Sequence, residues 1–177
     1  TVTDGPTLSY KFTEGKAIKY VNTSKVLQTM DINGQSMDVT VNSIVACTVK
    51  SKGIKDGNIV LEVRIDSIAQ FVDSPNGSAG GPVADVKGKV FDMVLSPSGK
   101  ELDLSGAKQI VINVDGAGQT DASQSFTDFF PDLPSGTVAP GYTWSTNDTI
   151  KSKSTSNSMV LSVKASHKFE GFEMMNG

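Results

Sequence analysis

The stretch MDVTVNSIVACTVKSKGIKDGNIVLEVRIDSI, which covers residues 37–68, decides the fold of this chain. Apolar side chains recur at alternate positions on both sides of a turn between Gly53 and Gly57. They are Met37, Val39, Val41, Val45, Cys47 and Val49 before the turn, and Ile59, Leu61, Val63 and Ile65 after it. Successive side chains of a β-strand point to opposite faces, so this period of two predicts a long hairpin with one apolar and one polar face.

Further strands are predicted on both sides of this hairpin. Residues 17–32 read as a long strand, joined to the hairpin by Asn33-Gly34, a dipeptide that favours a type I′ turn. Other strands are expected at residues 8–12, 83–95, 100–104, 142–144, 149–153 and 158–172. Residues 73–82 (DSPNGSAGGP) are expected to form a mobile loop or flap, because their glycines and prolines favour no regular element.

One later segment has helical spacing. Ala107, Ile110, Val111 and Val114 stand at positions i, i+3, i+4 and i+7, which predicts a short helix over residues 106–114. The run IVINV within this segment fits a strand equally well, because it is rich in β-branched residues.

A second helix is predicted over residues 121–130, opened by a capping-box-like pair and ended by Pro131. It places Phe126, Phe129 and Phe130 on one face, which makes a concentrated apolar stripe. This stripe is expected to lie on the apolar face of the sheet, although an exposed stripe that binds a partner is the alternative.

Together these elements predict a mainly β (α+β) fold. We expect a curved antiparallel sheet, or half-barrel, with one or two short helices packed on its concave face. A length of 177 residues suits one domain, so residues 7–177 are expected to form a single β-rich domain. Residues 1–6 are expected to form a flexible tether, at the trimmed end of a longer precursor.

Composition and motifs exclude several functions. The chain has a net charge of −3 with both signs scattered, whereas nucleic-acid binding needs a concentrated basic patch. Its single histidine, His167, and single cysteine, Cys47, provide neither a nucleophile–base pair nor a set of metal ligands. Two acidic segments, 31–38 and 115–121, lack the six to eight oxygen ligands that calcium needs. We expect a protein that is not an enzyme and uses no metal or cofactor.

The order of several short motifs resembles a known group of proteins. The motifs are Tyr10-Lys11-Phe12 with Gly15, a Met-rich Asn-Gly turn from Met30 to Met37, Leu-Ser-Pro-x-Gly-Lys at 95–100, Phe-Phe-Pro-x-Leu-Pro at 129–134, and Pro-Gly-x-x-Trp at 140–144. The chain resembles uncharacterised bacterial envelope lipoproteins of the Bacteroides type, which are similar to LolA-like half-barrel lipoprotein carriers. It departs from their pattern at Tyr142, where an acidic residue is usual. The resemblance implies export to the periplasm or cell surface, and membrane association only through an N-terminal lipid anchor that would precede Thr1.

The fold and the resemblance together predict a protein that binds an apolar ligand between sheet and helix. The expected partners are a lipid or other apolar ligand and an envelope protein. The candidate ligand-binding residues are Val41, Val45, Val63, Ile65, Phe91, Met93, Phe126, Phe129, Phe130 and Trp144. In the competing interpretation these side chains simply fill a closed core. The alternative function is a surface module that recognises glycan or protein through the 73–82 loop and Trp144.

Overall fold

The computed structural model describes residues 5–32, 35–114, 118–153 and 158–173, which form two compact units. The larger unit comprises Tyr10–Pro131, and the smaller unit comprises Thr1–Ser9 with Asp132–Gly177. Both are built mainly from antiparallel strands, so the predicted mainly β class is confirmed. The expectation of one domain over 7–177 stays a prediction. Residues 1–4 of the expected tether, and the Asn33-Gly34 turn, lie outside the described residues.

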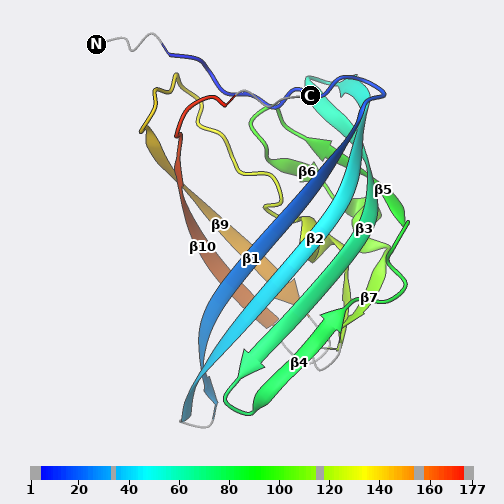
Figure 1. Ribbon diagram of the computed structural model, residues 1–177, viewed down its shortest axis with the longest axis vertical. Coiled ribbons are helices and arrows are strands. Elements are labelled where there is room, and N and C mark those ends of the chain that lie inside the picture. Colours follow the sequence, from blue (N-terminus) through cyan, green and yellow to red (C-terminus); the bar gives the residue numbers. More distant parts are fainter. Residues whose placement is uncertain (1–4, 33–34, 115–117, 154–157, 174–177) are drawn as a thin grey trace. The chain divides into compact units, whose positions relative to one another are not determined.

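A six-stranded antiparallel sheet is the main element of the larger unit and curls into a half-barrel (Figure 1). Its strands are β1 (Ala17–Ile32), β2 (Gln35–Lys55), β3 (Asn58–Ser74), β4 (Gly77–Pro82), β5 (Val90–Leu95) and β6 (Glu101–Asp103). The strand order is β1-β2-β3-β5-β6, and β4 also pairs with β3. One edge of β3 therefore serves two partners, because Ile59–Arg64 pairs with β5 while Ala69–Ser74 pairs with β4.

A β-bulge in β3 keeps the apolar side chains on one face. Cys47 pairs with Ile65 and Ala46 pairs with Ser67, so Asp66 is an extra residue of β3 that is paired with no residue of β2. An extra residue shifts the alternation by one position. Ile65 and Ile68 therefore both reach the core, although they stand three residues apart.

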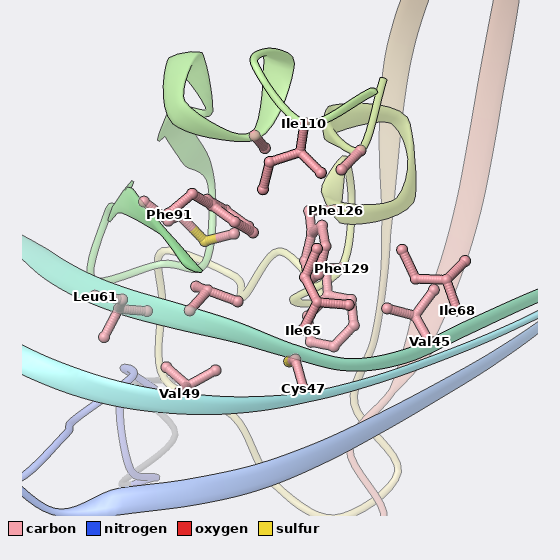
Figure 2. Packing of buried hydrophobic residues seen from close by; sticks show 14 of the residues in the cluster. Val45, Cys47, Val49, Leu61, Ile65, Ile68, Phe91, Ile110, Phe126 and Phe129 are labelled. Carbon is pink, nitrogen blue, oxygen red and sulfur yellow. The ribbon is translucent and has the colours of Figure 1, made fainter. Parts of the chain in front are cut away.

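The core of the larger unit lies between the concave face of the sheet and the segments that follow β6 (Figure 2). Strands β2, β3 and β5 supply one side of it, and Ala107, Ile110, Phe126, Phe129 and Phe130 supply the other. These apolar side chains are at most 9 % exposed. Short helices do pack on the concave face, as the sequence predicts.

The predicted helix over residues 106–114 is wrong beyond its first turn. Helix α1 is Ser105–Lys108, and Val111–Val114 forms strand β7, which pairs with β8 (Gly118–Asp121). The amide of Ile110 still closes the last helical turn onto the carbonyl of Ala107. The β-branched run that follows then takes the strand conformation that the alternative interpretation allowed.

The predicted helix over residues 121–130 is also too long. Helix α2 is Ser123–Phe126, and its N-cap is Ala122, which makes no side-chain cap bond. The Asp121 carboxylate, one residue earlier, accepts from the Ser123 amide at 2.9 Å. The backbone leaves the helix at Thr127, where ψ is 131°, and Asp128 follows with a φ of 54° in the left-handed region. Phe126, Phe129 and Phe130 nevertheless all reach the core, because the turn after α2 directs the last two toward it in place of the expected helix.

The expected loop at residues 73–82 is a hairpin instead. Strand β4 pairs with the far half of β3, and the approach is closest at Gly80. A Cβ atom at Gly80 would lie 2.2 Å from the carbonyl oxygen of Gln70, and its φ is 102°. The glycines that argued against regular structure therefore permit this strand pairing.

Several expected strands differ in the structure, among them the 100–104 and 158–172 strands, which are shorter as β6 and β10 (Ser158–Lys168). The strand predicted at residues 8–12 is wrong, because the chain there makes only isolated bridges at Thr7 and Glu14. The strand predicted at residues 83–95 is confined to β5. In the smaller unit, β9 (Thr143–Lys153) joins the two short strands expected there and pairs with β10. The amide of Val138 also donates to the carbonyl of Pro6 in this unit. Among the described residues, no helix has the length and apolar character that a membrane span requires.

Candidate functional site

Eight of the ten candidate ligand-binding residues come together in the core of the larger unit. They are Val45, Val63, Ile65, Phe91, Met93, Phe126, Phe129 and Phe130. Each is at most 6 % exposed, so the side chains contact one another and not solvent. Val41 is half-buried farther along β2, and Trp144 belongs to the smaller unit. A ligand could reach the eight only if part of this core moved.

An open groove of about 530 Å³ lies beside this core. Its lining residues are Tyr10, Lys11, Phe12, Glu14, Ser51, Gly53, Ile54 and Ile59. It is bounded by the extended segment 10–14 and by the end of the β2–β3 hairpin. The sequence did not predict this groove, because its two sides are about forty residues apart in the chain.

Backbone hydrogen bonds hold the extended segment across the end of the sheet. The amide of Tyr10 donates to the carbonyl of Pro97 at 2.9 Å, and the amide of Gly15 donates to the carbonyl of Ser51 at 3.0 Å. Between these anchors, Phe12 is half-buried and Lys11 is exposed. The groove therefore has an aromatic wall and carries one cationic and one anionic side chain, on Lys11 and Glu14.

Ile54 is the most exposed apolar side chain of the groove, at 77 %. A second bulge at Ser51–Gly53 brings Ile54 opposite Ile59, which is buried. The two isoleucines thus share one face of the sheet, and Ile54 extends that face beyond the core. The apolar wall opposite Tyr10 and Phe12 is formed in this way.

Ring contacts connect the groove to the interior. The ring centroid of Phe130 lies 5.5 Å from that of Tyr10 and 6.1 Å from that of Phe12. From Phe130 the contacts continue through Phe129 at 5.2 Å to Phe126 at 5.3 Å, and then to Phe91 at 4.9 Å. Figure 2 shows the inner part of this path above the sheet. An unbroken aromatic path therefore leads from the groove into the core.

Polar contacts fix the segment 127–131, here called the clasp, which carries Phe129 and Phe130. The Asn22 side-chain amide donates to the carbonyl of Phe129 at 3.3 Å, and the Tyr10 hydroxyl donates to the carbonyl of Pro131 at 2.9 Å. Gly99 allows the close approach of Tyr10 and Pro131, because a Cβ there would lie 2.6 Å from both. The clasp is thus bound at several points along a turn without regular structure.

Glu101 on β6 makes two further contacts to the clasp. Its Oε1 accepts from the amide of Phe130 at 3.2 Å, and its Oε2 accepts from the amide of Asp128 at 3.3 Å. Burial raises the pKa of Glu101 to about 7, and the nearby Asp128 carboxylate adds to this rise. Three backbone hydrogen bonds, from the amides of Phe130, of Asp128 and of Glu101 itself, act in the opposite direction, because they stabilise the ionised form.

The remaining candidate residues show no reactive arrangement. Burial raises the pKa of Cys47 to about 12, so the thiol stays protonated and is a poor nucleophile. The His167 Nε2 atom lies 3.2 Å from the Thr146 hydroxyl, and its ring stacks on Trp144. Within the described ranges, no three His, Cys, Asp or Glu side chains gather where they could hold a metal ion.

The two parts of the alternative recognition site belong to different units. Residues 73–82 lie in the larger unit and Trp144 lies in the smaller one. The Trp144 indole donates to the carbonyl of Asp132 at 2.8 Å, and its ring is near-parallel to those of Tyr142 and His167. Trp144 therefore belongs to a short row of rings at the start of the β9–β10 hairpin.

No protein family, no curated protein and no solved structure matches this chain. The resemblance to envelope lipoproteins stays a prediction. The groove and the aromatic path are the observations from which a function can be argued.

Proposed function

We propose that this protein is a non-enzymatic component of the bacterial cell envelope that binds an apolar ligand, such as a lipid acyl chain, in the groove beside the clasp. Ligand sites are concave, mainly apolar and several hundred cubic ångströms in volume. The groove, with a volume of about 530 Å³ and walls that include Tyr10, Phe12, Ile54 and Ile59, fits this description.

The aromatic path is the observation that carries the proposal. Phe130 contacts both aromatic side chains of the groove and is itself 3 % exposed. If the clasp moved, an acyl chain could replace the Phe130 ring and continue the apolar contact toward Phe129. The ligand would then cover the apolar core surface that the displaced Phe130 ring leaves.

The location in the envelope rests on the sequence resemblance. The non-enzymatic part of the proposal rests on the chemistry of the groove, whose titratable side chains are Tyr10, Lys11 and Glu14. A binding protein needs only shape and apolar surface at such a site, so the residues present are sufficient for binding.

The proposal can be tested with the full chain and a fluorescent apolar probe, 1-N-phenylnaphthylamine. Binding should enhance the probe's emission, and palmitate or a lysophospholipid should displace it. Native mass spectrometry of protein purified without detergent should show an adduct of lipid mass. If the spectrum is that of the bare chain and the probe does not bind, the proposal is wrong.

A matched pair of variants locates the binding site. Ile54→Asp places a charge on the groove wall and should weaken probe binding at least tenfold. Val21→Asp makes the same change at a β1 position that is 70 % exposed and lies next to Tyr20, on the opposite face of the sheet. Equal losses in both variants would show that the probe does not bind in the groove.

A glycan-binding function is the second candidate, and the ring row of the smaller unit favours it. The Tyr142 and Trp144 rings lie 6.2 Å apart with an interplanar angle of 29°, and Tyr142 is 42 % exposed. Sugars stack on such aromatic faces. Titration calorimetry with cell-wall and capsular oligosaccharides would detect this binding, and Tyr142→Ala should abolish it.

A further inference from the structure

The six-stranded sheet ends at β1 in a long, regular edge (blue in Figure 1). β1 has 16 residues and pairs with β2 without a register shift, and no other described strand pairs with it. Edge strands of natural proteins are usually short, bulged or interrupted by proline, because their free amides and carbonyls can bind another strand. The other edges follow this rule, since β6 has three residues and the glycine-rich β4 has six and ends at Pro82. The edge of β1 is the exception.

Apolar side chains are exposed along the same strand. Val21 is 70 % exposed and Leu27 is 73 % exposed, and the two share the face opposite Tyr20, which packs against the core. Residues 23–27 are exposed on both faces of the strand. The middle of β1 thus combines free backbone groups with exposed apolar side chains, which a further strand would cover together.

A second copy of β1 matches this edge in one antiparallel register. With Ser24 opposite Ser24 of the second copy, Val21 lies opposite Leu27 in two symmetric pairs. Lys19 and Lys25 then each lie opposite a threonine. Apolar cross-strand pairs stabilise a sheet, and like charges directly opposite each other destabilise it. This register therefore satisfies both conditions.

The neighbouring registers do not satisfy them. A two-fold axis at Thr23 would place Val21 opposite Lys25, and an axis at Lys25 would place two lysines opposite each other. Registers that differ by an odd number of residues would set the core face of one copy against the outer face of the other, so the pleat excludes them.

We propose that two copies of this protein associate through their β1 edges, antiparallel about a two-fold axis at Ser24, and so join their sheets into one continuous sheet. Such an interface presents the same surface on both subunits, so the association closes at two copies. The proposal goes beyond ligand binding and does not rest on it, because no described residue of β1 lines the groove.

Sedimentation velocity of the full chain over a range of concentrations tests the association, and should show a reversible equilibrium between monomer and dimer. Val21→Asp should raise the dissociation constant of the dimer about tenfold, because each dimer contains the Val21–Leu27 pair twice. Val90→Asp makes the same change at a position of β5 that is 51 % exposed, and should leave the equilibrium unchanged.

Three results would overturn the proposal. One is a monomer at every concentration, and another is an equal effect of Val21→Asp and Val90→Asp. The third is a monomer whose β1 amides are protected from hydrogen exchange, which would mean that another part of the chain covers this edge. Val21→Asp is also the control for probe binding in the groove, so loss of the dimer with retention of the probe would separate this proposal from the proposed function.

Cysteine variants test the register itself. Directly opposite residues of antiparallel strands have Cα atoms about 4.5–5.5 Å apart, a separation that a disulfide spans. Ser24→Cys should therefore form a disulfide-linked dimer on mild oxidation. Lys19→Cys should not, because its two copies would lie about 30 Å apart. The buried Cys47 of the wild type gives the background, and equal crosslinking of the two variants would refute the pairing at Ser24.

Discussion

Truncation of Phe130 tests whether this side chain occupies a position that a ligand can take, or is an ordinary core residue. The Phe130 ring is 3 % exposed and lies 5.2–5.5 Å, centroid to centroid, from Tyr10, Tyr20 and Phe129. Replacement of a buried Phe by Ala typically costs about 3–5 kcal/mol. Phe130→Ala should therefore lower the free energy of unfolding by about 3 kcal/mol, the low end, because the cavity it leaves adjoins an open groove and can fill with probe or solvent.

Phe126→Ala is the matched control, since Phe126 is fully buried and its ring contacts, Phe91 and Phe129, both lie outside the lining of the groove. Its cost should reach about 4–5 kcal/mol, because its cavity is closed on all sides. Urea unfolding followed by circular dichroism measures both values. In the probe assay, Phe130→Ala should bind 1-N-phenylnaphthylamine more tightly than the wild type, whereas Phe126→Ala should not.

The reasoning fails if the two variants behave alike. Equal losses of stability with no gain in probe affinity would mean that Phe130 is a closed-core residue without connection to the groove. A gain in Phe126→Ala but not in Phe130→Ala would mean that the apolar path does not begin at Tyr10 and Phe12.

Three further predictions follow from single contacts. Because the pKa of Glu101 is raised in the folded protein, its contribution to stability is complete below pH 4.5 and is lost as pH rises through about 7. The urea midpoint of the wild type should therefore be lower at pH 8.5 than at pH 5, and this difference should shrink in Glu101→Gln. Native Cys47 should react with iodoacetamide at pH 8 at least a hundredfold more slowly than in urea, as mass spectrometry would show, and equal rates would contradict its burial. Gly80→Val should detach β4 from β3 and speed amide exchange over 69–82, while exchange in β5 stays unchanged.

The sheet was predictable because its signal is local. The alternation from Val39 to Val49 requires only that neighbouring side chains point to opposite faces, and the structure follows it. The helices were less predictable, because Phe126, Phe129 and Phe130 have helical spacing and yet the turn at Asp128 delivers the last two to the core. That turn depends on Glu101, which is distant in sequence, so no local pattern could reveal it.

The groove was missed for a similar reason, although one signal was present. Ile54 is an apolar residue at a position where the alternation of the hairpin predicts a polar one. The bulge at Ser51–Gly53 resolves this exception by turning Ile54 toward the face of Ile59. Ile54, an apolar residue beside a glycine at a position where the alternation calls for a polar side chain, was therefore the sequence signal for the bulge and for the exposed apolar wall.

The bulge at Asp66 has a consequence for how the protein could be re-engineered. It separates β3 into two registers, one that pairs with β5 over the core and one that pairs with β4 beyond it. A change of length in the turn between Ser74 and Gly77 would alter only the second register, since the alternation of Ile59–Ile65 is set on the other side of the bulge. The far end of the sheet is thus a modular extension, where an inserted peptide or a shortened hairpin should leave the aromatic path and the groove intact.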